Sequence, residues 1–122
     1  MIIKNFEDLD IDNFPVVIFG SGPAGISTAI ELEKKNIKSL IIEAGDSDYS
    51  DQSQEFYKGV IVGDQITDLS ESRLRQFGGT VGHWGGWVKP MDIFNIDSWN
   101  FNYEDLNSYQ DKACEILKVK NI

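Results

Sequence analysis

The sequence has 122 residues, 41% of them hydrophobic and 25% charged, which is the balance of an ordinary globular domain and not that of a disordered, collagen-like or disulfide-stapled chain. Its formal net charge of −9 argues against nucleic acid as a partner, because binding phosphates requires clustered lysines and arginines. The single cysteine, Cys114, has no second thiol or histidine cluster with which to form a disulfide or hold a metal ion.

Residues 1–14 form an N-terminal extension that is acidic and contains no long apolar run. They therefore lack the basic start and the apolar centre of a secretory signal. No stretch of the sequence approaches the roughly 20 apolar residues that a membrane-spanning helix needs. We expect a cytoplasmic protein without a membrane span.

The next residues predict a strand, a helix and a second strand. Residues 15–20 are a short apolar run, which suits a strand buried on both faces of a parallel sheet. Residues 23–35 favour a helix with Pro23 near its first position and Asn36 at its end, and residues 38–42 give a second apolar strand. This order within about 30 residues predicts a βαβ unit, the start of an α/β, Rossmann-type domain with a parallel sheet.

The remaining segments carry weaker signals. Residues 46–54 are polar, and we expect a mobile surface loop there with little that enters a core. Residues 59–62 are compatible with a short strand. Residues 102–118 predict one amphipathic helix with Asn102 as its cap, and its apolar face is expected to carry Leu106, Tyr109, Ala113 and Leu117.

The turn between the first strand and the helix has glycines at three spaced positions. Gly20 permits a tight turn, Gly22 lets the backbone approach a pyrophosphate, and Gly25 lets the helix and strand pack closely. The N-terminus of the helix offers unpaired N–H groups and a partial positive charge to the phosphates. The pattern predicts a dinucleotide site, while the plainer interpretation is a tight turn from strand to helix.

Glu43 supports the dinucleotide interpretation, because it ends the second strand about 20 residues after the turn. An acid at this place can accept a hydrogen bond from a ribose hydroxyl and repels a 2′-phosphate. NADP is therefore not expected, whereas FAD and NAD both remain. The alternative for Glu43 is a solvated acid at the end of a strand.

Two further stretches resemble the glucose-methanol-choline (GMC) oxidoreductases. Residues 41–45 read Ile-Ile-Glu-Ala-Gly, and residues 73–86 contain Gly-Gly-Thr followed by His-Trp-Gly-Gly, a run similar to the sugar-oxidising branch that includes pyranose oxidase. The run from Trp99 to Leu117 resembles the family's entry into its substrate domain. The resemblance covers most of residues 15–118.

The resemblance implies that FAD, and not NAD, is the cofactor, with the second glycine cluster against the flavin and Arg75 helping to place it. His83 resembles the histidine that pyranose oxidases join covalently to the flavin, although Val81 and Gly82 stand where those enzymes have Ser-Thr. A non-covalent flavin contact and a purely structural role are the alternatives for His83. The expected cofactor-binding residues are Gly20, Gly22, Pro23, Ala24, Gly25, Glu43, Ala44, Arg75, Gly78, Gly79, Thr80, His83, Trp84 and Gly85.

The resemblance also implies a domain division and a reaction. Residues 15–95 would be a partial FAD-binding domain and residues 96–122 the start of a substrate domain, with Trp99 in a core. The reaction would be hydride transfer from a hydroxyl-bearing carbon of an alcohol or sugar to the flavin. The family's catalytic pair lies near the C-terminus of a longer chain, so we assign no catalytic residue here.

We accordingly expect the isolated chain not to turn over, either as a truncated oxidoreductase or as a split subunit completed by another polypeptide. A truncated sheet should expose an unpaired edge and an apolar face. Two alternatives stay open, a non-catalytic dinucleotide-binding or interaction module and a fragment of an NAD-dependent dehydrogenase.

Overall fold

The computed structural model of the protein describes residues 2–64, 66–89 and 102–120. The chain divides into two compact units, Met1–Trp84 and Gly85–Ile122. The expected domain boundary between residues 95 and 96 lies outside the described residues, as does Trp99 with its expected core position.

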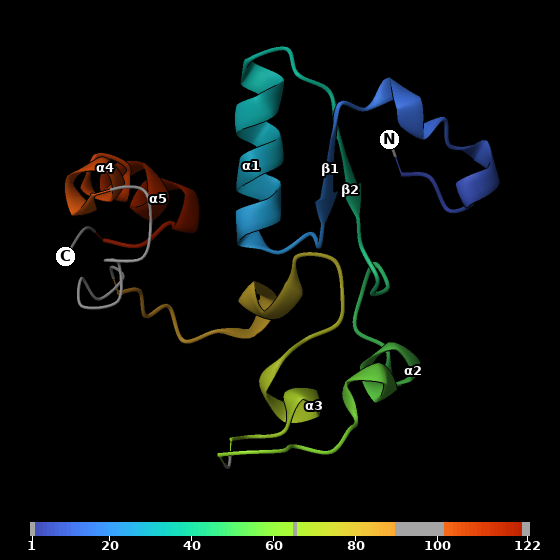
Figure 1. Ribbon diagram of the computed structural model, residues 1–122. Coiled ribbons are helices and arrows are strands. Elements are labelled where there is room, and N and C mark those ends of the chain that lie inside the picture. Colours follow the sequence, from blue (N-terminus) through green and yellow to red (C-terminus); the bar gives the residue numbers. More distant parts are fainter. Residues whose placement is uncertain (1, 65, 90–101, 121–122) are drawn as a thin grey trace. The chain divides into compact units, whose positions relative to one another are not determined.

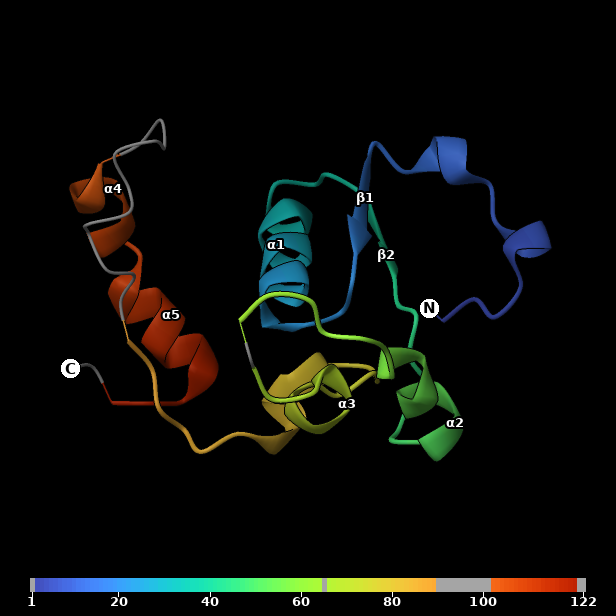
Figure 2. The same cartoon turned by 60° about the horizontal axis from the view of Figure 1, so that its bottom comes forward.

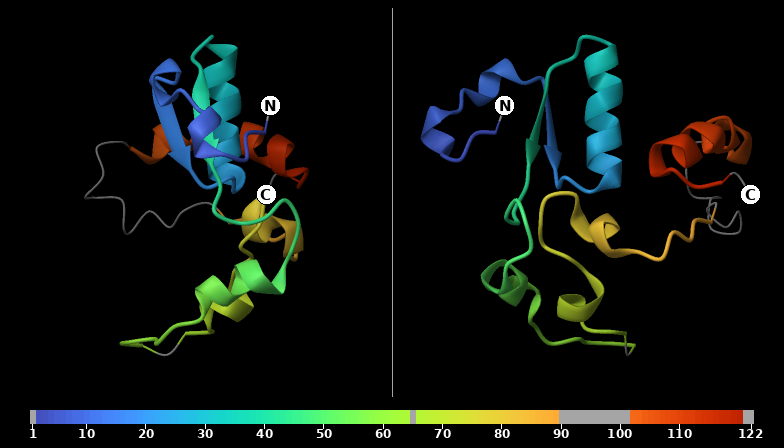
Figure 3. Two further views of the ribbon diagram at one scale, coloured as in Figure 1. Left: turned by 90° about the vertical axis from the view of Figure 1, so that its right-hand side faces the viewer. Right: turned by 180° about the vertical axis from the view of Figure 1, so that it is seen from behind.

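The first unit is built on a βαβ arrangement. Strands β1 (Val16–Phe19) and β2 (Ser39–Ile42) pair in parallel, with Ile18 opposite Ile41. Helix α1 (Pro23–Lys34) connects them and lies on one side of the strands in the views of Figure 1 and Figure 3. The predicted α/β start with a parallel sheet is confirmed, and within the described residues the sheet has these two strands.

Both ends of α1 follow from local sequence. Gly22 is the N-cap residue and Pro23 occupies the first helical position, where its missing N–H is not needed. At the other end Asn36 takes a left-handed conformation with φ of 58°, and its N–H donates to the carbonyl of Glu33 at 2.8 Å. Asparagine tolerates this conformation better than most residues, which is why the helix ends where the sequence predicts.

The first and third glycines of the turn have the steric roles expected for them. Gly20 adopts φ of 95°, which a residue with a side chain rarely does. A Cβ atom at Gly25 would lie 2.2 Å from the carbonyl oxygen of Gly20 and 3.2 Å from the side chain of Ile18. Glycine at position 25 therefore lets α1 lie directly against β1.

The tightest burial in the first unit is polar. Among the described residues Cys114 is the one apolar side chain classed as buried, and it belongs to the second unit. The buried residues of the first unit are Ser21, Ser53 and Gln54, whereas Phe19 at the end of β1 is 82% exposed. An apolar strand residue is thus open to solvent, as expected of a sheet with few strands.

Residues 46–77 form an excursion from the carboxyl end of the sheet that returns to its starting point. The N–H of Phe77 donates to the carbonyl of Asp46 at 2.8 Å, which closes the base of the excursion. It contains α2 (Asp51–Gln54), a 3₁₀ turn at Glu55–Tyr57, and α3 (Leu69–Ser72). Figure 2 shows α2 and α3 beyond the carboxyl ends of the strands.

The expectation that residues 46–54 contribute little to a core is wrong. Gln54 is 8% exposed, and its side-chain NH₂ group donates to the carbonyls of Ser70 at 2.7 Å and Arg73 at 2.5 Å. Its side-chain oxygen accepts from the N–H of Arg75 at 3.2 Å. Buried polar groups are tolerated when they are hydrogen-bonded, so hydrophobicity alone could not reveal this position.

Two other parts of the first unit are residues 59–62 and the N-terminal extension. No strand forms at residues 59–62, where Val60 and Val62 are more than 90% exposed. The N-terminal extension contains two 3₁₀ turns, Phe6–Asp8 and Ile11–Asn13.

The second unit contains two helices where the sequence predicted one. Helix α4 (Tyr103–Asn107) begins after Asn102, whose N–H donates to the carboxylate of Asp105 at 2.9 Å, and α5 (Gln110–Leu117) follows. At the break the N–H of Tyr109 donates to the carbonyl of Leu106 at 2.9 Å, three residues back, while the carbonyl of Asp105 accepts the hydroxyl of Ser108 at 2.8 Å.

The break changes which residues lie inward. Tyr109 becomes the N-cap of α5 and is 66% exposed, and Ala113 is exposed as well, so neither lies on a buried face. Cys114 is the buried side chain of α5, and Leu106 and Leu117 are half-buried. None of the described helices has the length and apolar character needed to cross a membrane.

Gln54 provides a test of how the excursion is held. Replacing Gln54 with Met should keep the shape of the side chain but leave two carbonyls and one N–H without partners, at a cost of about 2 kcal/mol in the free energy of unfolding. The exposed neighbour Gln52, replaced by Met, is the matched control and should change the stability by less than about 0.5 kcal/mol. Urea unfolding of both variants measures this, and equal losses would contradict the role of Gln54.

Candidate functional site

The glycine turn lies at the carboxyl edge of the sheet, between the end of β1 and the start of α1. Open parallel sheets bind ligands at this edge, in the crevice outside the strand ends. Ser21, the second residue of the turn, is completely buried with 0% of its surface exposed. Ser21 is therefore packed inside the protein, while Gly20 and Gly22 on either side of it border open space.

The N-terminus of α1 is available to an anion. The first N–H groups of an α-helix have no partner within the helix, and among the described residues no side chain caps α1. A Cβ atom at Gly22 would meet no neighbouring atom within 4 Å, so the backbone there is open to a close approach. Unpaired N–H groups, the positive end of the helix dipole and free space together suit a phosphate.

Glu43 turns back toward the glycine turn. Its Oε2 accepts from the N–H of Ser21 at 2.8 Å and from the hydroxyl of Ser21 at 2.6 Å. Its Oε1 accepts from the N–H of Gly45 at 2.7 Å. The N–H of Ala44 also donates to this carboxylate. These four bonds match the roughly four lone-pair positions that a carboxylate offers. Glu43 thus fixes the turn, a role that spacing alone did not reveal.

The environment of Glu43 favours its ionised form. Burial by itself would raise the pKa of the carboxyl group, but the hydrogen bonds from the Ser21 hydroxyl and from the N–H groups of Ser21, Gly45 and Ala44 outweigh it. The net effect lowers the pKa of Glu43 below its ordinary value. A fixed negative charge therefore stands at the end of β2.

The structure brings the second glycine segment, residues 78–80, to the first, residues 20–25. The N–H of Gly78 donates to the hydroxyl of Ser21 at 2.9 Å, across 57 positions of sequence. A Cβ atom at Gly79 would lie 3.5 Å from the Cα of Gly22. Gly78 and Gly79 both have left-handed backbones, with φ of 85° and 63°. The two glycine-rich stretches that the sequence analysis selected form one cluster.

Thr80 and Arg75 make contacts within the protein. The Thr80 hydroxyl oxygen accepts from the N–H of Leu74 at 3.1 Å and so supports the segment that precedes it. The guanidinium of Arg75 lies 4.4 Å above the ring of Phe56 and donates to the hydroxyl of Ser53 at 3.0 Å. Arg75 is thereby held against the excursion, and its expected role in placing a flavin stays a prediction.

The remaining expected site residues include exposed side chains of the first unit and one glycine of the second unit. His83 ends the 3₁₀ turn Gly79–His83 and is exposed, and the adjoining Trp84 is 40% exposed. Ala44 follows Glu43 with an exposed side chain. Gly85 belongs to the second unit. A bond or contact between His83 and a flavin stays a prediction.

Sequence reasoning missed Ser21 and Gly45. A Cβ atom at Gly45 would lie 2.4 Å from backbone atoms of Arg75, so glycine there lets the end of β2 meet the returning excursion. Both residues adjoin positions that the sequence pattern selects, because Ser21 stands inside the turn and Gly45 directly follows the Glu43-Ala44 pair. Neither position belongs to the general fingerprint, which names only the three glycines and the acid.

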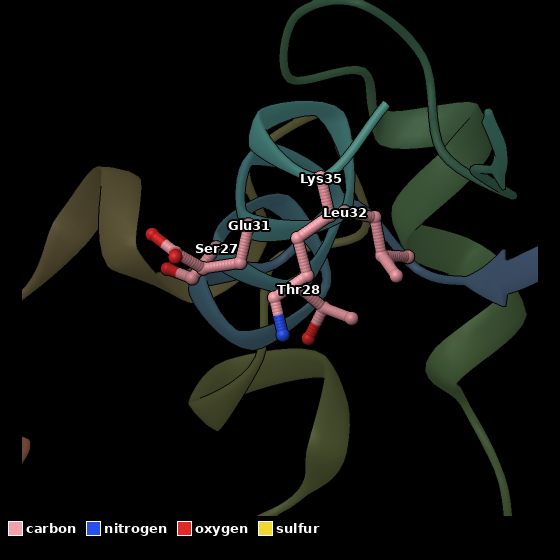
Figure 4. Close-up of a pocket in the computed structure, with 5 residues that line it drawn as sticks. All are labelled: Ser27, Thr28, Glu31, Leu32 and Lys35. Carbon is pink, nitrogen blue, oxygen red and sulfur yellow. The ribbon is translucent and has the colours of Figure 1, made fainter. Parts of the chain in front are cut away.

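A separate hollow of about 320 Å³ lies along α1, away from the glycine turn, and Figure 4 shows the side chains around it. All of them come from this one helix and its C-cap residue, namely Ser27, Thr28, Glu31, Leu32 and Lys35. Ligand sites generally enclose most of the ligand's surface, which one helix cannot do. The glycine cluster is the better candidate site.

Comparisons with known proteins add no family assignment: no protein-family model matches the chain, and searches of curated proteins and solved structures found no match. The resemblance to the GMC oxidoreductases therefore stays a prediction carried by the motif residues. The geometry of the glycine cluster is independent of that resemblance.

The lowered pKa of Glu43 has a defined consequence for stability. Folding favours the ionised form, so its contribution is complete above about pH 4.3, the ordinary pKa of glutamate, and is lost as the pH falls through the lower pKa of the folded state. At pH 7, replacing Glu43 with Gln should cost about 2 kcal/mol in the free energy of unfolding. Urea unfolding of both proteins should show this difference shrinking below about pH 4.3.

Glu33 on α1 provides the matched control for this titration. Its side chain is exposed, so Glu33→Gln should leave the free energy of unfolding nearly unchanged over the same pH range. A Glu43→Gln difference that stays constant down to pH 3, or one that Glu33→Gln reproduces, would contradict the account of Glu43.

Proposed function

We propose that this chain binds FAD at the glycine cluster, as the N-terminal part of a GMC-type oxidoreductase that oxidises a hydroxyl group of an alcohol or sugar. The observation that carries the proposal is the meeting of the two glycine segments at the N-terminus of α1, through the bond between Gly78 and Ser21. A turn with a purely structural role, from strand to helix, would need only the first glycine segment.

The residues present fit the adenosine and pyrophosphate parts of FAD. The N–H groups at the start of α1 would hold the pyrophosphate, beside the open space at Gly22. Glu43 would accept a hydrogen bond from one ribose hydroxyl, and its charge would repel a 2′-phosphate. This donor and acceptor set favours FAD or NAD over NADP.

The choice of FAD over NAD rests on the second segment. Gly78 and Gly79 lie beside the turn without side chains, which supports a second surface for an extended cofactor. The resemblance of residues 73–86 to the GMC oxidoreductases assigns the flavin to that surface. When bound, FAD supplies the acceptor for a hydride from the hydroxyl-bearing carbon.

The chain's own residues would bind and orient the cofactor, and the base for the hydroxyl proton would come from elsewhere. The only histidine of the sequence is His83, which stands beside the glycine cluster in sequence, so we assign it no part in proton transfer. We propose that another part of the protein or a completing polypeptide supplies the base and the substrate pocket. A cytoplasmic location is part of the same proposal.

Cofactor binding can be measured directly on the 122-residue chain. We expect FAD to bind with quenching or enhancement of its fluorescence, NAD to bind more weakly, and NADP not to bind detectably. Gly22→Ala should weaken FAD binding at least about tenfold, because a Cβ would occupy the space reserved for the pyrophosphate. The cost of this change in the free energy of unfolding should stay within about 1 kcal/mol, since the position only caps the helix.

Gly59→Ala is the matched control, because Gly59 also borders open space but lies in the excursion, and it should leave FAD binding unchanged. Full retention of FAD binding by Gly22→Ala would contradict the proposed site. NAD binding tighter than FAD binding would instead support the NAD-dependent dehydrogenase, and the absence of binding to any dinucleotide would sink the proposal.

A further inference from the structure

We infer that Ser21 is a positioning residue whose single hydroxyl holds the second glycine segment against the first and thereby completes the flavin-facing part of the site. The inference rests on the proposed function, because it assumes that FAD spans both segments. Ser21 is wholly buried, and its hydroxyl donates to Glu43 at 2.6 Å and accepts from the N–H of Gly78 at 2.9 Å. One oxygen atom thus joins three separate parts of the chain.

The direction of these bonds follows from the charge of Glu43. An ionised carboxylate can only accept, so the Ser21 hydroxyl must donate its hydrogen to Glu43. Its lone pairs are then left for the N–H of Gly78, which can only donate. The other bond from Ser21 to Glu43 comes from the backbone N–H, at 2.8 Å, and does not depend on the hydroxyl. Removing the hydroxyl therefore frees Gly78 but keeps a link between Glu43 and the turn.

The Gly78 bond is the polar link between the two glycine segments. Within the part of the chain that the structure describes, Gly79 donates to the carbonyl of Gln76, and Thr80 accepts from Leu74. Phe77, the residue before Gly78, donates to the carbonyl of Asp46 and so holds the start of the segment beside the end of β2. These bonds shape the segment but do not attach it to the turn. The bond from Gly78 to Ser21 is the described hydrogen bond that attaches the segment to the turn itself.

Loss of the Ser21 hydroxyl should therefore change the affinities for FAD and for ADP by different factors. ADP would use the N-terminus of α1 and Glu43, which keep their arrangement when the hydroxyl is lost. FAD would also need Gly78 and Gly79 in place. One hydrogen bond contributes about 1 kcal/mol, so Ser21→Ala should weaken FAD binding about fivefold and ADP binding by less than about twofold. General destabilisation of the fold would weaken both ligands by the same factor.

The experiment uses the full chain and compares Ser21→Ala with Thr28→Ala, whose hydroxyl donates to the carbonyl of Ala24 on the exposed side of α1. Dissociation constants for FAD and ADP are measured for each protein, together with hydrogen exchange of the Gly78 amide in the absence of ligand. We expect Ser21→Ala to speed Gly78 exchange about fivefold and to weaken FAD selectively, and Thr28→Ala to do neither.

Unchanged Gly78 exchange, or equal weakening of FAD and ADP, would overturn the inference. If the parent chain binds neither ligand, the proposed function fails, and Gly78 exchange still decides whether Ser21 holds the segment. If Ser21→Ala does not fold, Ser21→Cys retains a weakly bonding group of similar shape, and it should fold with intermediate exchange and intermediate loss of FAD. Parent-like values in Ser21→Cys would then count against the inference.

Discussion

The arrangement of the first unit depends on one hydrogen-bonded pair, the wholly buried Ser21 hydroxyl and the part-buried Glu43 carboxylate. The pair joins the turn after β1 to the end of β2, and through the N–H of Gly78 it joins both to a segment that arrives after the long excursion. The ionised carboxylate accepts the hydroxyl hydrogen of Ser21, which leaves a lone pair of that oxygen for the N–H of Gly78. No apolar side chain described in this unit is buried to the same extent.

The polar core also explains how a small unit can present a ligand surface. Several glycines near the turn are needed for separate steric reasons, such as the 2.2 Å approach at Gly25 or the left-handed backbone at Gly78. Side chains at these positions would separate the segments or fill the space beside α1. The same absence of side chains leaves N–H groups exposed at the helix N-terminus, which is what a bound phosphate requires.

Much of the βαβ unit could be predicted, because apolar runs and the Gly, Pro and Asn signals act locally. The contacts that assemble the site could not, because they join residues far apart in sequence: Gln54 with Ser70, and Ser21 with Gly78. Polar side chains such as Gln54 carry no hydrophobic signal, so their burial emerges only in three dimensions. The helix predicted at 102–118 is divided at Ser108 and Tyr109, where the N–H of Tyr109 bonds to Leu106 in place of Asp105, a local change that periodicity does not register.

The most direct test of the account is to map ligand-induced changes of backbone amide resonances in the isotopically labelled chain during titration with FAD. The account predicts that the largest changes occur at the N–H groups of Gly22, Ala24 and Gly25 and at those of Gly78 and Gly79. Changes confined to the hollow along α1, at residues 27–35, or an unchanged spectrum at saturating FAD, would contradict it.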